Sequence, residues 1–158
     1  MRSSLIGGLA CAAILSIGLV LAACGSSDDN STSTTAALSK AEFLKQGNAV
    51  CKKGNQQINQ AGKQVFGTNG NHKKPTQAEQ TKFATDTLIP TVQTEIDGVK
   101  ALGAPKGDEA QVKAIVDTAQ TALDKGKADP TQLIQGDSDP FAKANKLANA
   151  YGLTECGG

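Results

Sequence analysis

Apolar residues recur at steps of three and four along most of the chain beyond residue 38, which is the repeat of an amphipathic helix. The first helix is predicted to begin at Ser39–Glu42, a capping-box pattern. Gly47 and Gly54 fall on its apolar face, where glycine weakens a helix but would let a neighbouring backbone come close. That face comprises Phe43, Gly47, Val50, Cys51, Gly54, Ile58, Ala61 and Val65.

A loop rich in turn-forming residues is expected at 67–75, followed by a second capping box at Thr76–Glu79. The helix that begins there contains Pro90, which cannot donate a backbone hydrogen bond and should kink or split the helix near residues 86–89. Gly103-Ala104-Pro105 should end it. Its apolar positions are Phe83, Leu88, Ile89, Val92, Ile96, Val99 and Leu102.

A third helix is predicted from about Asp108 to Lys125, and Gly126 is expected to cap its C-terminal end. Asp129-Pro130 should then start a short helical turn that stops at Gly136. The residues expected to point inward from the third helix are Val112, Ile115, Val116, Ala119, Ala122 and Leu123.

Ser138-Asp139-Pro140 repeats this start signal and predicts a last helix that Gly152 closes. No segment alternates apolar and polar residues as a half-buried strand would. The predicted fold class is therefore all-α: a small antiparallel bundle of about four helices joined by short loops.

The first residues follow a different pattern. Met1 and Arg2 form a short positive start, and residues 5–23 are an uncharged run of apolar and small residues. This is the layout of a secretory signal, although a retained transmembrane helix, which takes about 20 residues, is the alternative. Leu21-Ala22-Ala23-Cys24 at the end of the run resembles the lipobox of bacterial lipoproteins, in which cleavage falls just before the cysteine.

The lipobox resemblance implies where the protein resides. It implies a diacylglycerol on the Cys24 thiol and a further acyl group, such as palmitate, on the new amine, and two or more chains anchor a protein stably. The expected location is the extracytoplasmic face of the cell membrane. The chain then divides into a signal peptide at 1–23, a lipidated tether at 24–38 and a helical domain at 39–158. Since the tether has no large apolar residue before Leu38, it is expected to be disordered.

Two cysteines remain in the domain, Cys51 and Cys156. In an exported protein they lie outside the reducing cytosol, where a disulfide is the default. Closing a loop of about 100 residues stabilises a fold by roughly 4–5 kcal/mol in the chain-entropy model. The alternatives are a free thiol and a redox pair, although the sequence contains no C-x-x-C.

Charge and composition exclude several partners. Removing Arg2, the only arginine among 16 basic residues, leaves 15 lysines against 15 acidic residues. A neutral domain is a poor match for nucleic acid, and without arginine it lacks the side chain best suited to bidentate capture of phosphate. There is no tryptophan and one tyrosine, so stacking platforms for bases or sugars are not expected.

No cofactor or metal is predicted either. The one histidine, His72, falls in the expected loop, and no methionine follows Met1, so haem ligands are missing. Asp137 and Asp139 flank Ser138 as calcium ligands might, but Phe141 occupies the next ligand position and helix capping is the simpler interpretation. No catalytic residues are predicted, because no Gly-x-Ser-x-Gly elbow or Ser-His-Asp pattern is present.

The sequence around each domain cysteine invites a family comparison. Asn48 to Asn55, around Cys51, and Tyr151-Gly152-Leu153-Thr154-Glu155-Cys156-Gly157 are similar to the corresponding segments of small helical lipoproteins of high-GC Gram-positive bacteria. The resemblance spans roughly residues 40–157. It implies an envelope location and a disulfide, and it implies no activity.

Two functions are compatible with these observations. The first is a binding or interaction module of the cell envelope, held at the membrane by its lipid and contacting an envelope protein, a wall polymer or a small apolar ligand. A ligand would lie between helices near Pro90 and the Gly47/Gly54 face, in an apolar pocket. The alternative is a carboxylate-dependent envelope hydrolase, which requires two acidic side chains in one cleft. The candidates are Asp86, Asp97, Asp117 and Asp124.

Overall fold

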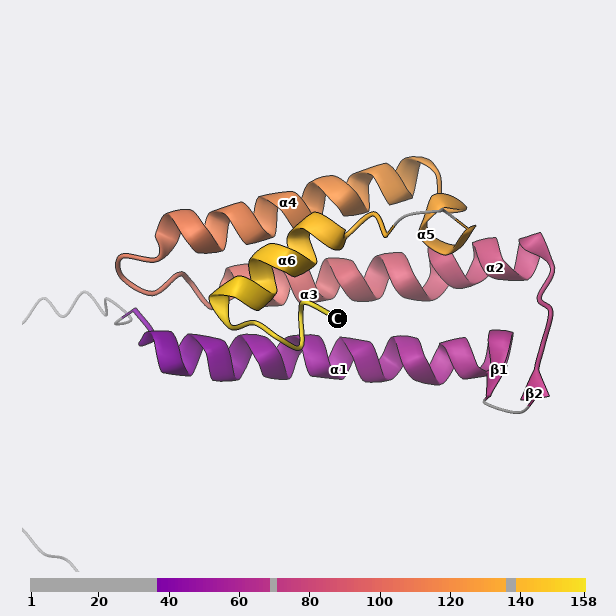
Figure 1. The fold of residues 1–158 in the computed structure, drawn as a ribbon, viewed down its shortest axis with the longest axis horizontal. Helices are drawn as coiled ribbons and strands as arrows, with labels where there is room; N and C mark the ends of the chain where they lie inside the picture. The colour runs from indigo at the N-terminus through magenta and orange to yellow at the C-terminus, as the bar shows by residue number, and fades with distance from the viewer. Residues whose placement is uncertain (1–36, 69–70, 136–138) are drawn as a thin grey trace, which may run out of the picture. The chain divides into compact units, whose positions relative to one another are not determined.

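The computed structural model describes residues 37–68, 71–135 and 139–158 (Figure 1). The predicted signal peptide, Cys24 and nearly all of the predicted tether lie outside the described residues, as do Gly136 and Asp137. Within the described residues, no helix is both long enough and apolar enough to cross a membrane.

The described part of the domain is helical, which confirms the predicted all-α bundle (Figure 1). Helix α1 packs against α3, α3 packs against α4, and α4 packs against α6, with consecutive long helices running in opposite directions. The elements are α1 (Lys40–Phe66), β1 (Gly67–Thr68), β2 (Asn71–His72), α2 (Gln77–Phe83), the π-helical segment η1 (Ala84–Leu88), α3 (Ile89–Ala101), α4 (Glu109–Ala128), α5 (Gln132–Gln135) and α6 (Ala142–Tyr151). The expected loop at 67–75 therefore contains a minimal antiparallel pair, β1 with β2.

Helix α1 begins where the sequence predicts. The Ser39 hydroxyl accepts a hydrogen bond from the Glu42 backbone N–H (3.3 Å), and the Glu42 carboxylate accepts one from the Ser39 N–H (3.1 Å). The expectation about the two glycines was wrong in one respect: side chains, not backbone, approach them. A Cβ at Gly47 would lie 2.7 Å from Leu153, and a Cβ at Gly54 would lie 1.8 Å from the carboxyl of Glu95.

The interruption predicted near residues 86–89 is present as the π-helical segment η1, between α2 and α3. The N–H of Ile89 bonds to the carbonyl of Ala84, five residues earlier instead of four. Pro90 has no N–H to donate and its ring crowds the preceding turn, so one extra residue in that turn accommodates it. The helical path continues from α2 through η1 into α3.

Gly126 was expected to cap α4, and this was wrong. The helix continues to Ala128, and Gly126 is buried inside it. A Cβ at Gly126 would lie 2.5 Å from the Leu133 side chain, so glycine is required for the close approach of α5. Asp129 and Asp139 each bond to the backbone just before the next helix: Asp129 accepts from the Thr131 N–H (3.1 Å) and Asp139 accepts from the Phe141 N–H (2.8 Å). The last helix begins two residues later than predicted, at Ala142, with Phe141 as its N-cap.

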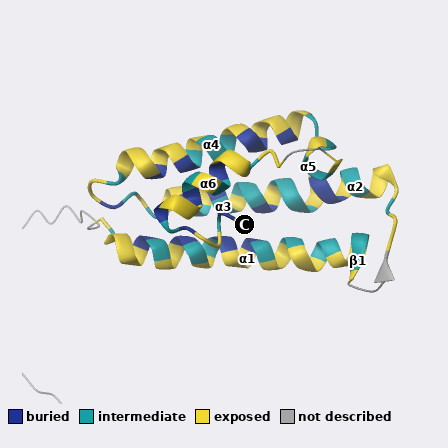
Figure 2. Ribbon diagram, in the orientation of Figure 1, coloured by how far each residue is buried: buried dark blue, intermediate teal, exposed yellow. Residues whose placement is uncertain are grey.

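The core lies where α1, α3, α4 and α6 meet, and buried positions face inward on each of these helices (Figure 2). Phe43, Leu123 and Leu153 are fully buried. Cys51 and Cys156 form the predicted disulfide, which joins α1 to the C-terminal segment across 105 residues. Leu38, assigned to the tether from sequence, packs against this core.

Replacing both cysteines by alanine is expected to lower the free energy of unfolding by about 4–5 kcal/mol, because the denatured chain loses a constraint spanning about 100 residues. Urea denaturation of the full-length protein, followed by circular dichroism, measures this change. Wild-type protein treated with dithiothreitol should lose a similar amount, whereas the double variant should not respond to the reductant. A double variant as stable as the oxidised wild type would contradict a stabilising role for the bridge.

Candidate functional site

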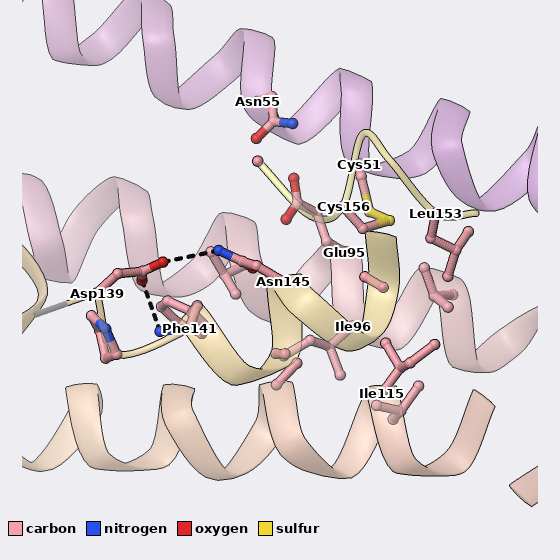
Figure 3. Close-up of a pocket in the computed structure, with 18 of the residues that line it drawn as sticks. Cys51, Asn55, Glu95, Ile96, Ile115, Asp139, Phe141, Asn145, Leu153 and Cys156 are labelled. Carbon is pink, nitrogen blue, oxygen red and sulfur yellow. Dashed lines mark hydrogen bonds between the residues drawn. A yellow bond between two sulfur atoms is a disulfide. The ribbon is translucent and has the colours of Figure 1, made fainter. Parts of the chain in front are cut away.

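A cavity of about 340 Å³ lies among α1, α3, α4 and α6 (Figure 3). The disulfide and the segment after α6 form part of its wall. Most of the wall is apolar, and the polar side chains among the described lining residues are Asn55, Glu95, Asp139 and Asn145. The apolar lining side chains include Ile58, Leu88, Val92, Ile96, Val99, Ile115, Val116, Leu133, Phe141 and Leu153.

The helical repeat of the sequence explains why these side chains converge. Val92, Ile96 and Val99 lie three or four residues apart on α3, so they share one face and point into the bundle. On α6 the corresponding positions are Ala144 and Ala148, which are too small to fill the space between helices. Large apolar residues such as Ile58 and Val92 therefore remain only partly buried, and they line a cavity instead of completing the core.

The cavity occupies part of the region in which the sequence predicts a pocket. Leu88 and Val92, on either side of Pro90, line it, and so does Cys51, three residues from Gly54. Pro90 itself is exposed and does not line the cavity. The Gly47 end is closed, because the buried Leu153 side chain fills the space beside that glycine.

Glu95 is the polar residue that distinguishes this cavity. Its Oε1 atom is buried and has no hydrogen-bond partner among the described residues. Desolvation by burial raises the pKa of the Glu95 carboxyl from its ordinary value of 4.5 to about 7. The carboxyl therefore changes its protonation state near neutral pH, unlike an exposed glutamate.

The space for this carboxyl is provided by Gly54 on α1. A Cβ at Gly54 would lie 1.8 Å from Oε1 and 2.5 Å from Cδ of Glu95, so any larger residue would displace the side chain. In Figure 3 the carboxyl points from α3 toward α1, on the side of Asn55 and the disulfide. Glycine in a helix and an unpartnered buried carboxyl are each unfavourable alone, and here they occur as a matched pair.

The other polar residues of the wall already have protein partners. Asp139 accepts hydrogen bonds from the Phe141 N–H (2.8 Å) and from the Asn145 amide (3.0 Å), as the dashed lines of Figure 3 show. The Asn55 amide donates to the Glu155 carbonyl (2.6 Å). Asp139 thus bonds to the backbone before α6, whereas the buried Oε1 atom of Glu95 has no hydrogen-bond partner among the described residues.

Glu95 was not among the site residues predicted from the sequence, although a signal was present. Glu95 lies three residues after Val92 and four before Val99, so it falls on the apolar face of α3 where a charged residue is out of place. The presence of Gly54 opposite it depends on how α1 and α3 pack together. That juxtaposition cannot be obtained from either helix alone.

The four aspartates considered for a hydrolase are exposed, and none of them lines the cavity. Each bonds to a neighbour on its own helical segment: Asp86 to Lys82, Asp97 to Gln93, Asp117 to Lys113, and Asp124 to Gln120. Among the residues that the structure describes, no group of three or more His, Cys, Asp or Glu side chains could hold a metal ion.

Glu95 is expected to make stability depend on pH. Because its pKa is raised on folding, the folded protein holds a proton that the unfolded chain releases between pH 4.5 and about 7, and stability falls as pH rises through this window. Glu95→Gln removes this loss. The melting temperature of the variant minus that of wild type should therefore be a few degrees larger at pH 8 than at pH 4.

Thermal denaturation of the full-length protein, followed by circular dichroism at the two pH values, measures the difference. The matched control is Asp97→Asn, which neutralises an exposed carboxylate on the same helix outside the cavity. A constant offset between Glu95→Gln and wild type at both pH values would contradict the raised pKa.

The chain was also compared with known proteins. It matches no protein-family model, no curated protein and no solved structure.

Proposed function

We propose that the chain is an extracytoplasmic lipoprotein, anchored to the cell membrane through Cys24, whose helical domain binds a small, largely apolar ligand. The observation that carries the proposal is the apolar cavity of about 340 Å³ among four helices. The cavity is partly open to solvent, and its wall is mostly apolar. A concave, mostly apolar site with a few polar groups is typical of small-molecule binding sites.

The volume limits the ligand to a small molecule. Ligand pockets range from about 300 to 1,000 Å³, so this cavity lies at the lower end. A ligand that buries about 200 Å² of apolar surface would gain roughly 5 kcal/mol, at about 25 cal/mol per Å². Part of this gain is offset by the loss of translational and rotational freedom on binding. An affinity weaker than micromolar is therefore expected for a purely apolar probe.

The anchoring part of the proposal rests on sequence alone. Its support is the lipobox-like Leu21-Ala22-Ala23-Cys24 after an apolar run, in residues outside the described part of the chain. A lipid anchor would hold the domain beside the bilayer, where small apolar molecules concentrate. A disulfide between Cys51 and Cys156 is compatible with this oxidising location.

Two alternatives are less well supported. A domain that docks only to an envelope protein or a wall polymer has no need of an apolar cavity. A carboxylate-dependent hydrolase requires two acidic groups free to act in one cleft. Of the two acidic side chains among the described lining residues, Asp139 already accepts hydrogen bonds from the Phe141 N–H and the Asn145 amide. Binding is therefore the function that we favour.

The binding proposal predicts that the full-length protein, reconstituted in lipid nanodiscs, binds the fluorescent apolar probe 1-aminoanthracene in excess of empty discs. Ala119→Phe places a large side chain on the α4 wall of the cavity and should weaken binding about tenfold or more. Ala110→Phe is the matched control, because residue 110 is exposed on the same helix and does not line the cavity. Equal probe binding by both variants would place the probe elsewhere and refute the proposal.

The anchoring proposal predicts the mass of the native protein. Intact-mass analysis of protein extracted from its own membrane should find a chain that starts at Cys24 and carries diacylglycerol and a further acyl group. Cys24→Ala should prevent both the modification and the cleavage that depends on it. An unmodified residue 24, or a chain that retains residues 1–23, would overturn this part of the proposal.

A further inference from the structure

We infer that the ligand of this cavity is a small apolar cation: a hydrophobic body carrying one protonated amine, whose ammonium group pairs with the carboxylate of Glu95. This inference rests on the proposed binding function and specifies its ligand. It follows from the sign of charge on the wall, from the unused hydrogen-bonding capacity of Glu95 and from the space that Gly54 leaves for that side chain.

The charge on the wall favours a cation. Among the described lining residues the ionisable side chains are Glu95 on α3 and Asp139 before α6, and both are acidic. Helix α1 contributes Asn55 as its polar lining residue, α6 contributes Asn145, and no lysine lines the cavity within the described residues. A carboxylate ligand such as a fatty acid would face charge of its own sign, which makes binding unfavourable.

The hydrogen bonds of the wall identify Glu95 as the contact point. Asp139 and Asn55 are engaged with protein atoms, whereas Oε1 of Glu95 is buried without a donor among the described residues. Glu95 as a whole is partly buried, so its carboxylate is partly desolvated and has no donor in exchange. A donor of opposite charge would relieve that cost. An ammonium group supplies up to three such donors together with the positive charge.

The Gly54–Glu95 pair indicates that the packing of α1 against α3 provides a specific space for this carboxyl. The Glu95 carboxyl occupies the space that a side chain at residue 54 would fill. Alanine at 54 with an apolar residue at 95 would give a better helix and a drier core. Glycine inside a helix and a carboxyl on an apolar face are both locally unfavourable. Two such residues that fit each other are expected at a functional site.

An ammonium group makes better use of Glu95 than a neutral donor does. In the low dielectric of a cavity, a charge-assisted hydrogen bond is about twice as strong as one between neutral groups. Because burial raises the pKa of Glu95 to about 7, the carboxyl is readily ionised once a cation lies beside it. A neutral alcohol of the same shape would keep the apolar contacts and lose the charge pairing.

Three rigid probes of one shape test the inference: 1-adamantylamine, 1-adamantanol and 1-adamantanecarboxylate. Each is titrated at pH 8 by calorimetry into the full-length protein in nanodiscs, with empty discs as the blank. The amine should bind about 10- to 100-fold more tightly than the alcohol, the range expected for a hydrogen bond to a charged group. The carboxylate should bind most weakly.

Two variants assign the preference to one side chain. Glu95→Gln keeps the shape of the side chain and removes its charge, so the advantage of the amine over the alcohol should disappear. The readout is therefore the ratio of the two affinities rather than either one, and circular dichroism of the variant shows separately that it is folded. Asp97→Asn, which neutralises an exposed carboxylate two residues away, should keep the full preference for the amine.

The outcomes separate the inference from the proposed function. Three outcomes would overturn the inference and leave a binding cavity in place. They are equal binding of alcohol and amine, a preference for the amine that survives Glu95→Gln, and tightest binding of the carboxylate. If none of the three probes binds, the inference fails together with the proposed function. Loss of the preference in both Glu95→Gln and Asp97→Asn would show that general surface charge is responsible, which also overturns it.

Discussion

The attachment of the C-terminal segment to α1 is the constraint on which the rest of the domain depends. The Cys51–Cys156 bridge is its covalent part. Around the bridge, the Asn48 amide donates to the Gly152 carbonyl (3.0 Å) and its oxygen accepts from the Glu155 N–H (2.9 Å). The fully buried Leu153 fills the space beside Gly47. This attachment places the last segment over the bundle, and without it one wall of the cavity would be missing.

A second attachment holds the same, C-terminal end of α6. The Tyr151 hydroxyl donates to the Asp108 carboxylate (2.8 Å), and Lys40 lies 3.3 Å from the same carboxylate and 4.3 Å from the centre of the tyrosine ring. Hydrogen bonding by Tyr151 lowers the pKa of Asp108, and burial raises the pKa of Tyr151. The start of α1, the start of α4 and the end of α6 are thus joined at one point. Two attachments, one to α1 and one to the start of α4, therefore hold the C-terminal end of the short helix that walls the cavity.

The sequence predicts much of this fold because its signals are local. The capping boxes at Ser39 and Thr76, the positive-φ glycine at Gly152 and the interruption before Pro90 each depend on a few neighbouring residues. The role of Gly126 was wrong because glycine near the end of a helix can serve either as a cap or as a point of close approach. Only the position of Leu133 distinguishes these two roles.

The candidate site was harder to predict because it depends on contacts between helices and not on neighbouring residues in the sequence. The expected region was partly right, since Leu88 and Val92 beside Pro90 line the cavity. The chemistry was not anticipated, because the significance of Glu95 depends on a glycine 41 positions earlier that becomes its neighbour only when α1 and α3 pack. Volume left unfilled between helices is also a property of the assembled bundle. No periodicity within a single helix encodes it.

The π-helical segment η1 has a geometric consequence for how the protein can vary. One additional residue in a turn rotates everything beyond it by about a quarter of a circle. Helix α2 therefore presents Phe83 to Phe66 of α1 (ring centroids 5.4 Å apart), while α3 presents a different side to the interior. One unbroken helical path thus meets α1 through Phe83 in its first half and turns Val92 and Glu95 toward the cavity in its second. The wide turn sets the phase difference that makes both contacts possible.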